Sequence, residues 1–124
     1  MHGDVRQQLG RLGEQAAAEH LIRRGFEIVE RNYRTRWGEL DIIACDGHAL
    51  VFCEVKTRRV VQPGAEPLDA VNGRKRTQVR KMAGQWLVAR TDRPYAAKLR
   101  FDAIGVTFDS AGTLVRIEHV EDAF

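Results

Sequence analysis

Two acids and a lysine lie inside two neighbouring apolar segments of the chain. Asp41 directly precedes the apolar run Ile42 to Cys45, and Glu54-Val55-Lys56 directly follows the next apolar run, which ends at Cys53. An unpaired carboxylate in a sheet interior either acquires a cation or gives up its ionisation. Mg²⁺ takes oxygen ligands, usually one or two carboxylates completed by water and phosphate. We therefore predict a divalent metal site at Asp41 and Glu54, with Lys56 orienting or deprotonating a water molecule.

The dipeptide Asp46-Gly47 between the two segments predicts a β-hairpin. If the loop has an even length and is centred on this dipeptide, residues that pair across the two strands have numbers that sum to 93. Asp41 then pairs with Phe52 and is a diagonal neighbour of Glu54. Such neighbours lie roughly 7–8 Å apart at Cα and can share one ion. With a side-chain period of two, one face receives Glu39, Asp41, Phe52, Glu54 and Lys56, and the other receives Leu40, Ile42, Val51, Cys53 and Val55.

A solvated row of charges is the competing interpretation, in which Lys56 simply pairs with Glu54 on an open sheet face. Ile43, Leu50 and Phe52 fall on the same predicted face. Because these apolar side chains need cover, the face is expected to be partly buried, which favours the metal site.

Further motifs accompany the two acids along the chain. They are Gly10 to Glu14, Gly25, Arg31-Asn32-Tyr33-Arg34, Gly38-Glu39-Leu40-Asp41, Val51 to Arg58 and Arg100-Phe101-Asp102. The acid, the hairpin and Glu54-x-Lys56 resemble the core of the PD-(D/E)XK, or restriction-endonuclease-like, superfamily, whose members cleave nucleic acids with a divalent metal. Over nearly its whole length the chain resembles the small bacterial YraN-like family. Leu40 stands where the superfamily motif often has proline.

The resemblance implies an α/β fold with a restriction-endonuclease-like three-layer core, in which helices flank a central mixed five-stranded sheet. It also implies Mg²⁺ or Mn²⁺ held by Asp41, Glu54 and the backbone oxygen of Val55. Some members of the superfamily place a further glutamate from an N-terminal helix beside the metal. Others place a lysine or glutamine from a later helix there.

A helix is predicted over Gln8 to Arg24, with Gly25 ending it. At 100° per residue Glu14 shares a stripe with Gly10, Ala17, Ala18 and Leu21, the side that must pack on the sheet. Glu14 is therefore a candidate third catalytic acid. The alternative is that it stabilises the helix dipole from solvent.

The remaining elements follow from periodicity and turn residues. They are a strand over Phe26 to Tyr33, a loop over Val61 to Pro67 expected to frame the substrate entrance, a helix from Asn72 toward Arg90, and strands over Lys98 to Phe108 and Leu114 to Val120. Lys75 and Gln78 would lie at the site end of the second helix, either near the metal or in solvent. Trp86 and Met82 are assigned to the core, and Asp102 to a local ion pair with Arg100.

Length and composition indicate a single domain over residues 1–124. Hydrophobic content of 44% with 30% charged residues argues against disorder, and no apolar run is long enough to span a bilayer. Cys45 and Cys53 are expected on opposite faces as free thiols, as is usual in the cytoplasm, so we expect a cytoplasmic protein.

Basic residues flank the predicted metal site, and the net charge is +3. Lysine and arginine contacts to phosphate supply sequence-independent affinity for nucleic acid. The stretch from Arg74 to Lys81 can equally be a solvated charge run. The candidate nucleic-acid-binding residues are Arg34, Arg36, Arg58, Arg74, Lys75 and Gln78.

Together these patterns predict a metal-dependent endonuclease that hydrolyses phosphodiester bonds, in DNA rather than RNA. The competing hypothesis is a nucleic-acid-binding or adaptor module on a nuclease fold, in which the acids form a structural ion-pair cluster. A domain that binds only proteins is a third reading. The sheet edges and Trp37 are compatible with a homodimer, but the sequence does not require one.

Overall fold

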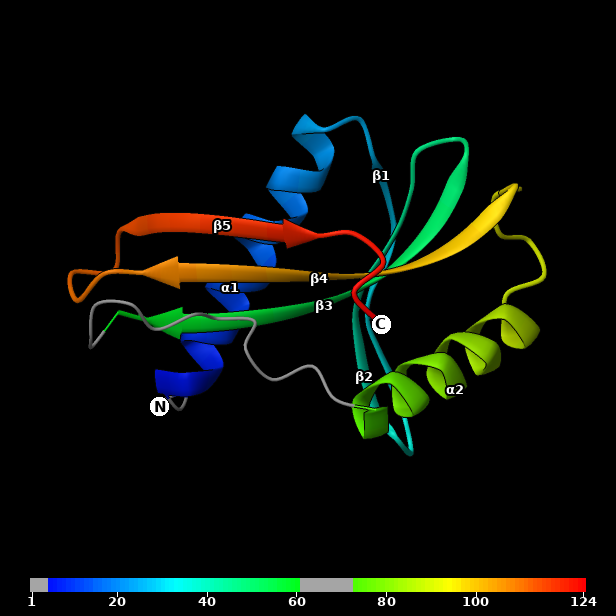
Figure 1. Ribbon diagram of the computed structural model, residues 1–124, viewed down its shortest axis with the longest axis horizontal. Coiled ribbons are helices and arrows are strands. Elements are labelled where there is room, and N and C mark those ends of the chain that lie inside the picture. Colours follow the sequence, from blue (N-terminus) through cyan, green and yellow to red (C-terminus); the bar gives the residue numbers. More distant parts are fainter. Residues whose placement is uncertain (1–4, 61–72) are drawn as a thin grey trace.

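The computed structural model describes residues 5–60 and 73–124, and side chains within 7–60 and 75–124 (Figure 1). The elements follow one another in the predicted order of helix, three strands, helix and two strands. They are α1 (Val5–Arg23), β1 (Glu27–Thr35), β2 (Gly38–Cys45), β3 (Ala49–Arg59), α2 (Gly73–Ala89), β4 (Lys98–Phe108) and β5 (Leu114–Val120). None of the helices in the described part of the chain is long and apolar enough to cross a membrane.

The strands form one five-stranded sheet in the order β1-β2-β3-β4-β5. The β3–β4 pair is parallel and the other pairs are antiparallel, so the sheet is mixed, as predicted. One core cluster joins α1 to the sheet and a second joins α2 to it. The two helices therefore cover opposite faces, and the fold is the predicted three-layer α/β arrangement (Figure 1).

Two glycines determine where α1 ends and how closely it packs on the sheet. Gly25 has φ +92°, and the amide of Phe26 donates to the carbonyl of Leu21 at 3.0 Å, a left-handed helix end. Gly13 faces β3, where a Cβ would collide with the side chain of Thr57. Glycine at this position lets α1 approach β3 closely and brings the next residue, Glu14, to the sheet.

The predicted hairpin forms, but its register was wrong by two residues. Ile42 pairs with Cys53 and Cys45 with Leu50, so paired numbers sum to 95 instead of 93. The cause is the side chain of Asp46, whose Oδ1 accepts the amides of residues 48 and 49 at 2.9 and 2.8 Å. This side chain organises a turn centred one residue later than Asp46-Gly47.

The regular alternation of faces predicted for β2 does not hold beside Asp41. Leu40 and Ile43 both belong to the core under α2, although residues three apart should face opposite ways. The strand therefore changes phase between them, beside the end of the paired stretch at Ile42–Cys53. Asp41 consequently turns toward α1.

The two cysteines occupy opposite faces, as predicted. Cys53 packs in the core under α1 and Cys45 in the core under α2, and both are free thiols. Met82 and Trp86 are buried in the core under α2, which confirms their structural assignment.

Candidate metal centre

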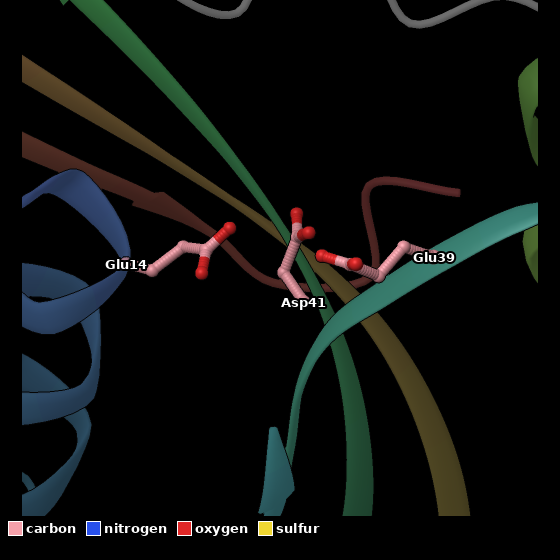
Figure 2. A group of neighbouring side chains, drawn as sticks. All are labelled: Glu14, Glu39 and Asp41. Atoms are coloured by element: carbon pink, nitrogen blue, oxygen red, sulfur yellow. The ribbon is translucent and has the colours of Figure 1, made fainter. Parts of the chain in front are cut away.

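Three carboxylates converge between α1 and β2. Glu14 comes from α1, and Glu39 and Asp41 come from β2, each with a carboxylate oxygen within 4.8 Å of the others. Figure 2 shows Asp41 between the two glutamates, with the three side chains directed toward one another. Carboxylates this close repel one another unless they bind protons or cations. The cluster is therefore a candidate site for a hard divalent ion.

Asn32 of β1 holds the two glutamates of the cluster. Its backbone is left-handed, with φ 55°, a conformation that asparagine tolerates better than most residues. Its side-chain amide donates to Glu14 at 2.8 Å and to Glu39 at 2.9 Å. One neutral side chain thus fixes carboxylates from two different elements.

Asp41 is linked to β3 and has a strongly shifted pKa. Its Oδ2 accepts the backbone amide of Val55 at 2.7 Å. Burial raises the pKa of Asp41 to about 7, against the lowering effect of that hydrogen bond, and the negative charges of Glu54, Glu14 and Glu39 raise it further. Every charged group that shifts this pKa is itself an acid, so the site favours either a proton or a cation.

Glu54 is not a member of the group of three converging acids. Its carboxylate forms an ion pair with Lys75 of α2 at 2.6 Å. Lys56, two residues along the strand, has an exposed side chain. The two predicted acids thus have different partners: Asp41 lies beside Glu14 of α1, and Glu54 pairs with Lys75 of α2. Glu54 is still close enough to raise the pKa of Asp41.

The candidate nucleic-acid-binding residues lie in several places. Arg34 is exposed on β1 and pairs with Glu39 at 3.3 Å, and the Arg36 guanidinium lies 4.7 Å from the ring centre of Trp37. Arg58 on β3 and Gln78 on α2 are half-buried. The side chain of Arg74 and the loop 61–67 lie outside the described residues.

A cavity of about 340 Å³ adjoins the acidic cluster. Gln7, Gly10 and Arg11 of α1 and Asn32 and Arg34 of β1 line it. Glu14 and Glu39 belong both to this lining and to the cluster. The cluster is therefore reached from a space that also presents two arginines.

Sequence reasoning did not select Glu39 or Asn32 as site residues. Alternation placed Glu39 on the face of Asp41, so a signal for Glu39 was present. The role of Asn32 depends on a left-handed backbone and on two contacts 7 and 18 residues away, and no local pattern indicates it.

A second carboxylate site lies in the sheet, at Asp102 of β4. Arg100 donates to both of its oxygens, which confirms the predicted ion pair, and His119 of β5 lies 2.8 Å from Oδ2. The amide of Asp122 also donates to it. Burial alone would raise the pKa of Asp102, but the hydrogen bonds from His119 and Arg100 outweigh burial and keep it below its ordinary value.

Comparisons with known proteins give the family of the chain. The model of an uncharacterised protein family, UPF0102, matches residues 13–106. The chain belongs to this family. The resemblance to the YraN-like family is thereby confirmed.

Relatives in UPF0102 match the chain over almost its full length. A UPF0102 protein of Frankia casuarinae is 48% identical over 94% of this chain and 95% of its own. One of Pelotomaculum thermopropionicum is 41% identical over 98% of each chain. One of Dictyoglomus thermophilum is 39% identical over 94% of this chain and 97% of its own. The names of these relatives state the family alone.

Proposed function

We propose that the protein is a metal-dependent endonuclease that hydrolyses phosphodiester bonds in nucleic acid, with DNA preferred to RNA. The observation that carries the proposal is the environment of Asp41. A largely buried carboxylate whose pKa is raised by three acidic neighbours is electrostatically incomplete. A divalent cation completes such a group, and phosphate oxygens are natural further ligands of that cation.

The donor set fits Mg²⁺ or Mn²⁺. All donors are oxygens: the carboxylates of Asp41, Glu14 and Glu39, with Glu54 and the backbone oxygen of Val55 as the ligands expected from the family resemblance. No thiol or imidazole belongs to the cluster of acids. Hard oxygen donors favour Mg²⁺ and Mn²⁺ over Zn²⁺.

A metal ion held by these carboxylates would polarise a water molecule and offset negative charge on the phosphate. The amide of Val55 fixes the orientation of the Asp41 carboxylate by donating to its Oδ2. Asn32 keeps Glu14 and Glu39 in place, so that either can accept a proton from a water molecule. Lys56, exposed beside Glu54, orients the nucleophile or offsets charge on the phosphate.

One observation favours the alternative of a non-catalytic binding module. Glu54 is already neutralised by Lys75 at 2.6 Å, as expected of a structural ion pair. In the nuclease hypothesis Lys75 must release this carboxylate, or remain beside it while other acids hold the metal. The two functions predict different outcomes when Asp41 is changed.

The deciding experiment compares wild type with Asp41→Asn on fluorescently labelled branched DNA, single-stranded DNA and RNA, with Mg²⁺ or Mn²⁺. A nuclease loses cleavage in the variant and retains binding. Asp92→Asn, an exposed acid after α2, is the matched control and keeps wild-type cleavage. Equal behaviour of wild type and Asp41→Asn in every metal-dependent assay contradicts the proposal.

A further inference from the structure

Gly10 is a glycine without a packing reason inside α1. A Cβ at this position would meet no atom within 4 Å, in contrast to Gly13, where it would collide with Thr57. Glycine in a helix interior destabilises the helix relative to alanine. Gly10 also lines the 340 Å³ cavity beside the acidic cluster. The missing side chain therefore keeps this cavity open.

The cavity has the chemistry of a nucleotide subsite. Arg11 and Arg34 offer planar cations, on which unpaired bases stack and to which phosphates bind. Gln7 offers an amide group that hydrogen-bonds to base edges, and Asn32, whose amide nitrogen is held by Glu14 and Glu39, offers its amide oxygen. Because Glu14 also belongs to the acidic cluster, a nucleotide here carries its phosphate toward the proposed metal.

The size of the cavity restricts the form of the substrate. About 340 Å³ is near the lower end of the roughly 300–1,000 Å³ found for small-molecule pockets. This volume suits one nucleotide and is too small for a base pair. The volume therefore favours an unpaired nucleotide, as in single strands, flaps and branch points.

We propose that the cavity between α1 and β1 binds one unpaired nucleotide next to the scissile phosphate, so that the substrate is a single-stranded segment and not a continuous duplex. The inference rests on the proposed nuclease function in one respect, namely that the phosphate next to the bound nucleotide is the one that is cleaved. Binding of the unpaired nucleotide can nevertheless be measured without any cleavage.

The test fills the cavity from Gly10. Gly10→Leu places a side chain in the open space, and Gly84→Leu is the matched control, because Gly84 is an exposed glycine of α2 with nothing within 4 Å of its Cβ position and does not line the cavity. Both replacements introduce a better helix former, so both variants should fold and melt no lower than wild type. Circular dichroism and thermal melting check this.

Affinity is measured by fluorescence anisotropy in EDTA, with one short oligonucleotide presented as a single strand or as a duplex. Wild type should bind the single strand at least about tenfold more tightly than the duplex, and Gly10→Leu should lose about tenfold for the single strand, at the low end of the effect of losing one stacked base. Gly84→Leu should behave as wild type. Equal affinity for both forms, or unchanged single-strand binding by Gly10→Leu, overturns the proposal.

Cleavage with Mg²⁺ or Mn²⁺ separates this inference from the proposed function. If wild type cleaves nothing but Gly10→Leu still loses single-strand affinity, the subsite stands and the nuclease function fails. If wild type cleaves and Gly10→Leu matches it in KM for single strands, the nuclease stands and the subsite fails. An abasic nucleotide beside the cleaved bond should raise KM for wild type and leave that of Gly10→Leu unchanged.

Discussion

Asp41 and Asp102 are carboxylates in neighbouring parts of one sheet, yet their surroundings are opposite. Asp102 is fully buried and receives hydrogen bonds from Arg100 and the amide of Asp122, with His119 beside it, and its pKa is lowered. Asp41 receives one amide and faces other acids, and its pKa is raised to about 7. The first site is complete within the chain, whereas the second requires a proton or a cation. Burial alone therefore does not tell whether the charge of an acid is balanced within the chain.

The largest effect is expected at the complete site. Asp102→Asn removes the buried anion that Arg100 contacts at 2.9 Å and leaves its 11% exposed side chain with only Glu121, at 3.5 Å, as an anionic partner. Breaking a buried pair in this way costs about 3–5 kcal/mol in the free energy of unfolding. Urea denaturation measures the loss. Glu118→Gln, which removes the acid of the more exposed Arg116–Glu118 pair on β5, serves as control and should cost less than about 1 kcal/mol.

Metal addition tests the incomplete site. Mg²⁺ or Mn²⁺ at about 100 times its dissociation constant should add about 2.7 kcal/mol to the free energy of unfolding of wild type. Asp41→Asn should lose this response and Asp92→Asn should keep it. Differential scanning calorimetry at pH 7.5 with and without EDTA provides the measurement. An equal rise in Asp41→Asn would move the metal site away from Asp41.

The pH dependence of stability should differ between the two acids in metal-free protein. The pKa of Asp41 rises from 3.8 to about 7 on folding, so the folded state holds this proton more tightly than the unfolded state. The contribution of Asp41 to stability is therefore full below about pH 4, declines toward pH 7 and stays low above it. The pKa of Asp102 is lowered on folding, so its effect on stability has the opposite pH dependence. Asp102 stabilises the fold above about pH 4, and this contribution is lost as the pH falls further.

Asp41→Asn isolates the Asp41 contribution. At pH 8 it removes the cost of ionising a carboxyl among acids and should raise the free energy of unfolding by roughly 1–3 kcal/mol. At pH 4 the variant and wild type should be nearly equal, because both carry a neutral side chain. Urea denaturation at the two pH values, in EDTA, gives the comparison. A destabilised variant at pH 8 would place Asp41 in the same class as Asp102.

The smallest effect is expected at the Lys75–Glu54 pair. Lys75 is 41% exposed in its side chain, so Lys75→Met should change the free energy of unfolding by less than about 1 kcal/mol, and added salt should remove most of the difference. Urea denaturation at low and high ionic strength measures this. A loss of several kcal/mol, insensitive to salt, would make Glu54 a structural acid like Asp102.

The fold was predictable because its signals are local. Gly25 ends α1, and the predicted bounds of β4 and β5, Lys98–Phe108 and Leu114–Val120, match the structure. Apolar periodicity also placed Glu14 on the inner side of α1, where it meets Asp41.

The site was only partly predictable because its details depend on single side chains. Asp46 shifts the hairpin register through its own hydrogen bonds, and a phase change between Leu40 and Ile43 turns Asp41 toward α1. Neither the shifted register nor the phase change leaves a detectable mark on the composition or the apolar periodicity of the sequence. Likewise Arg100 was assigned to Asp102 from its spacing of two, whereas His119 lies 17 residues away on another strand.

The unequal pairing of β3 has a consequence for the order of folding. β3 pairs with β2 at Ile42 to Cys45 only, but with β4 along its whole length from Ala49 to Arg59. The stretch of β3 that carries Glu54 is thus secured by a strand that begins at Lys98. Closing this long parallel connection is entropically slow, so the nucleus for refolding should exclude this stretch of β3, and Glu54 should reach its final position only in the last kinetic phase.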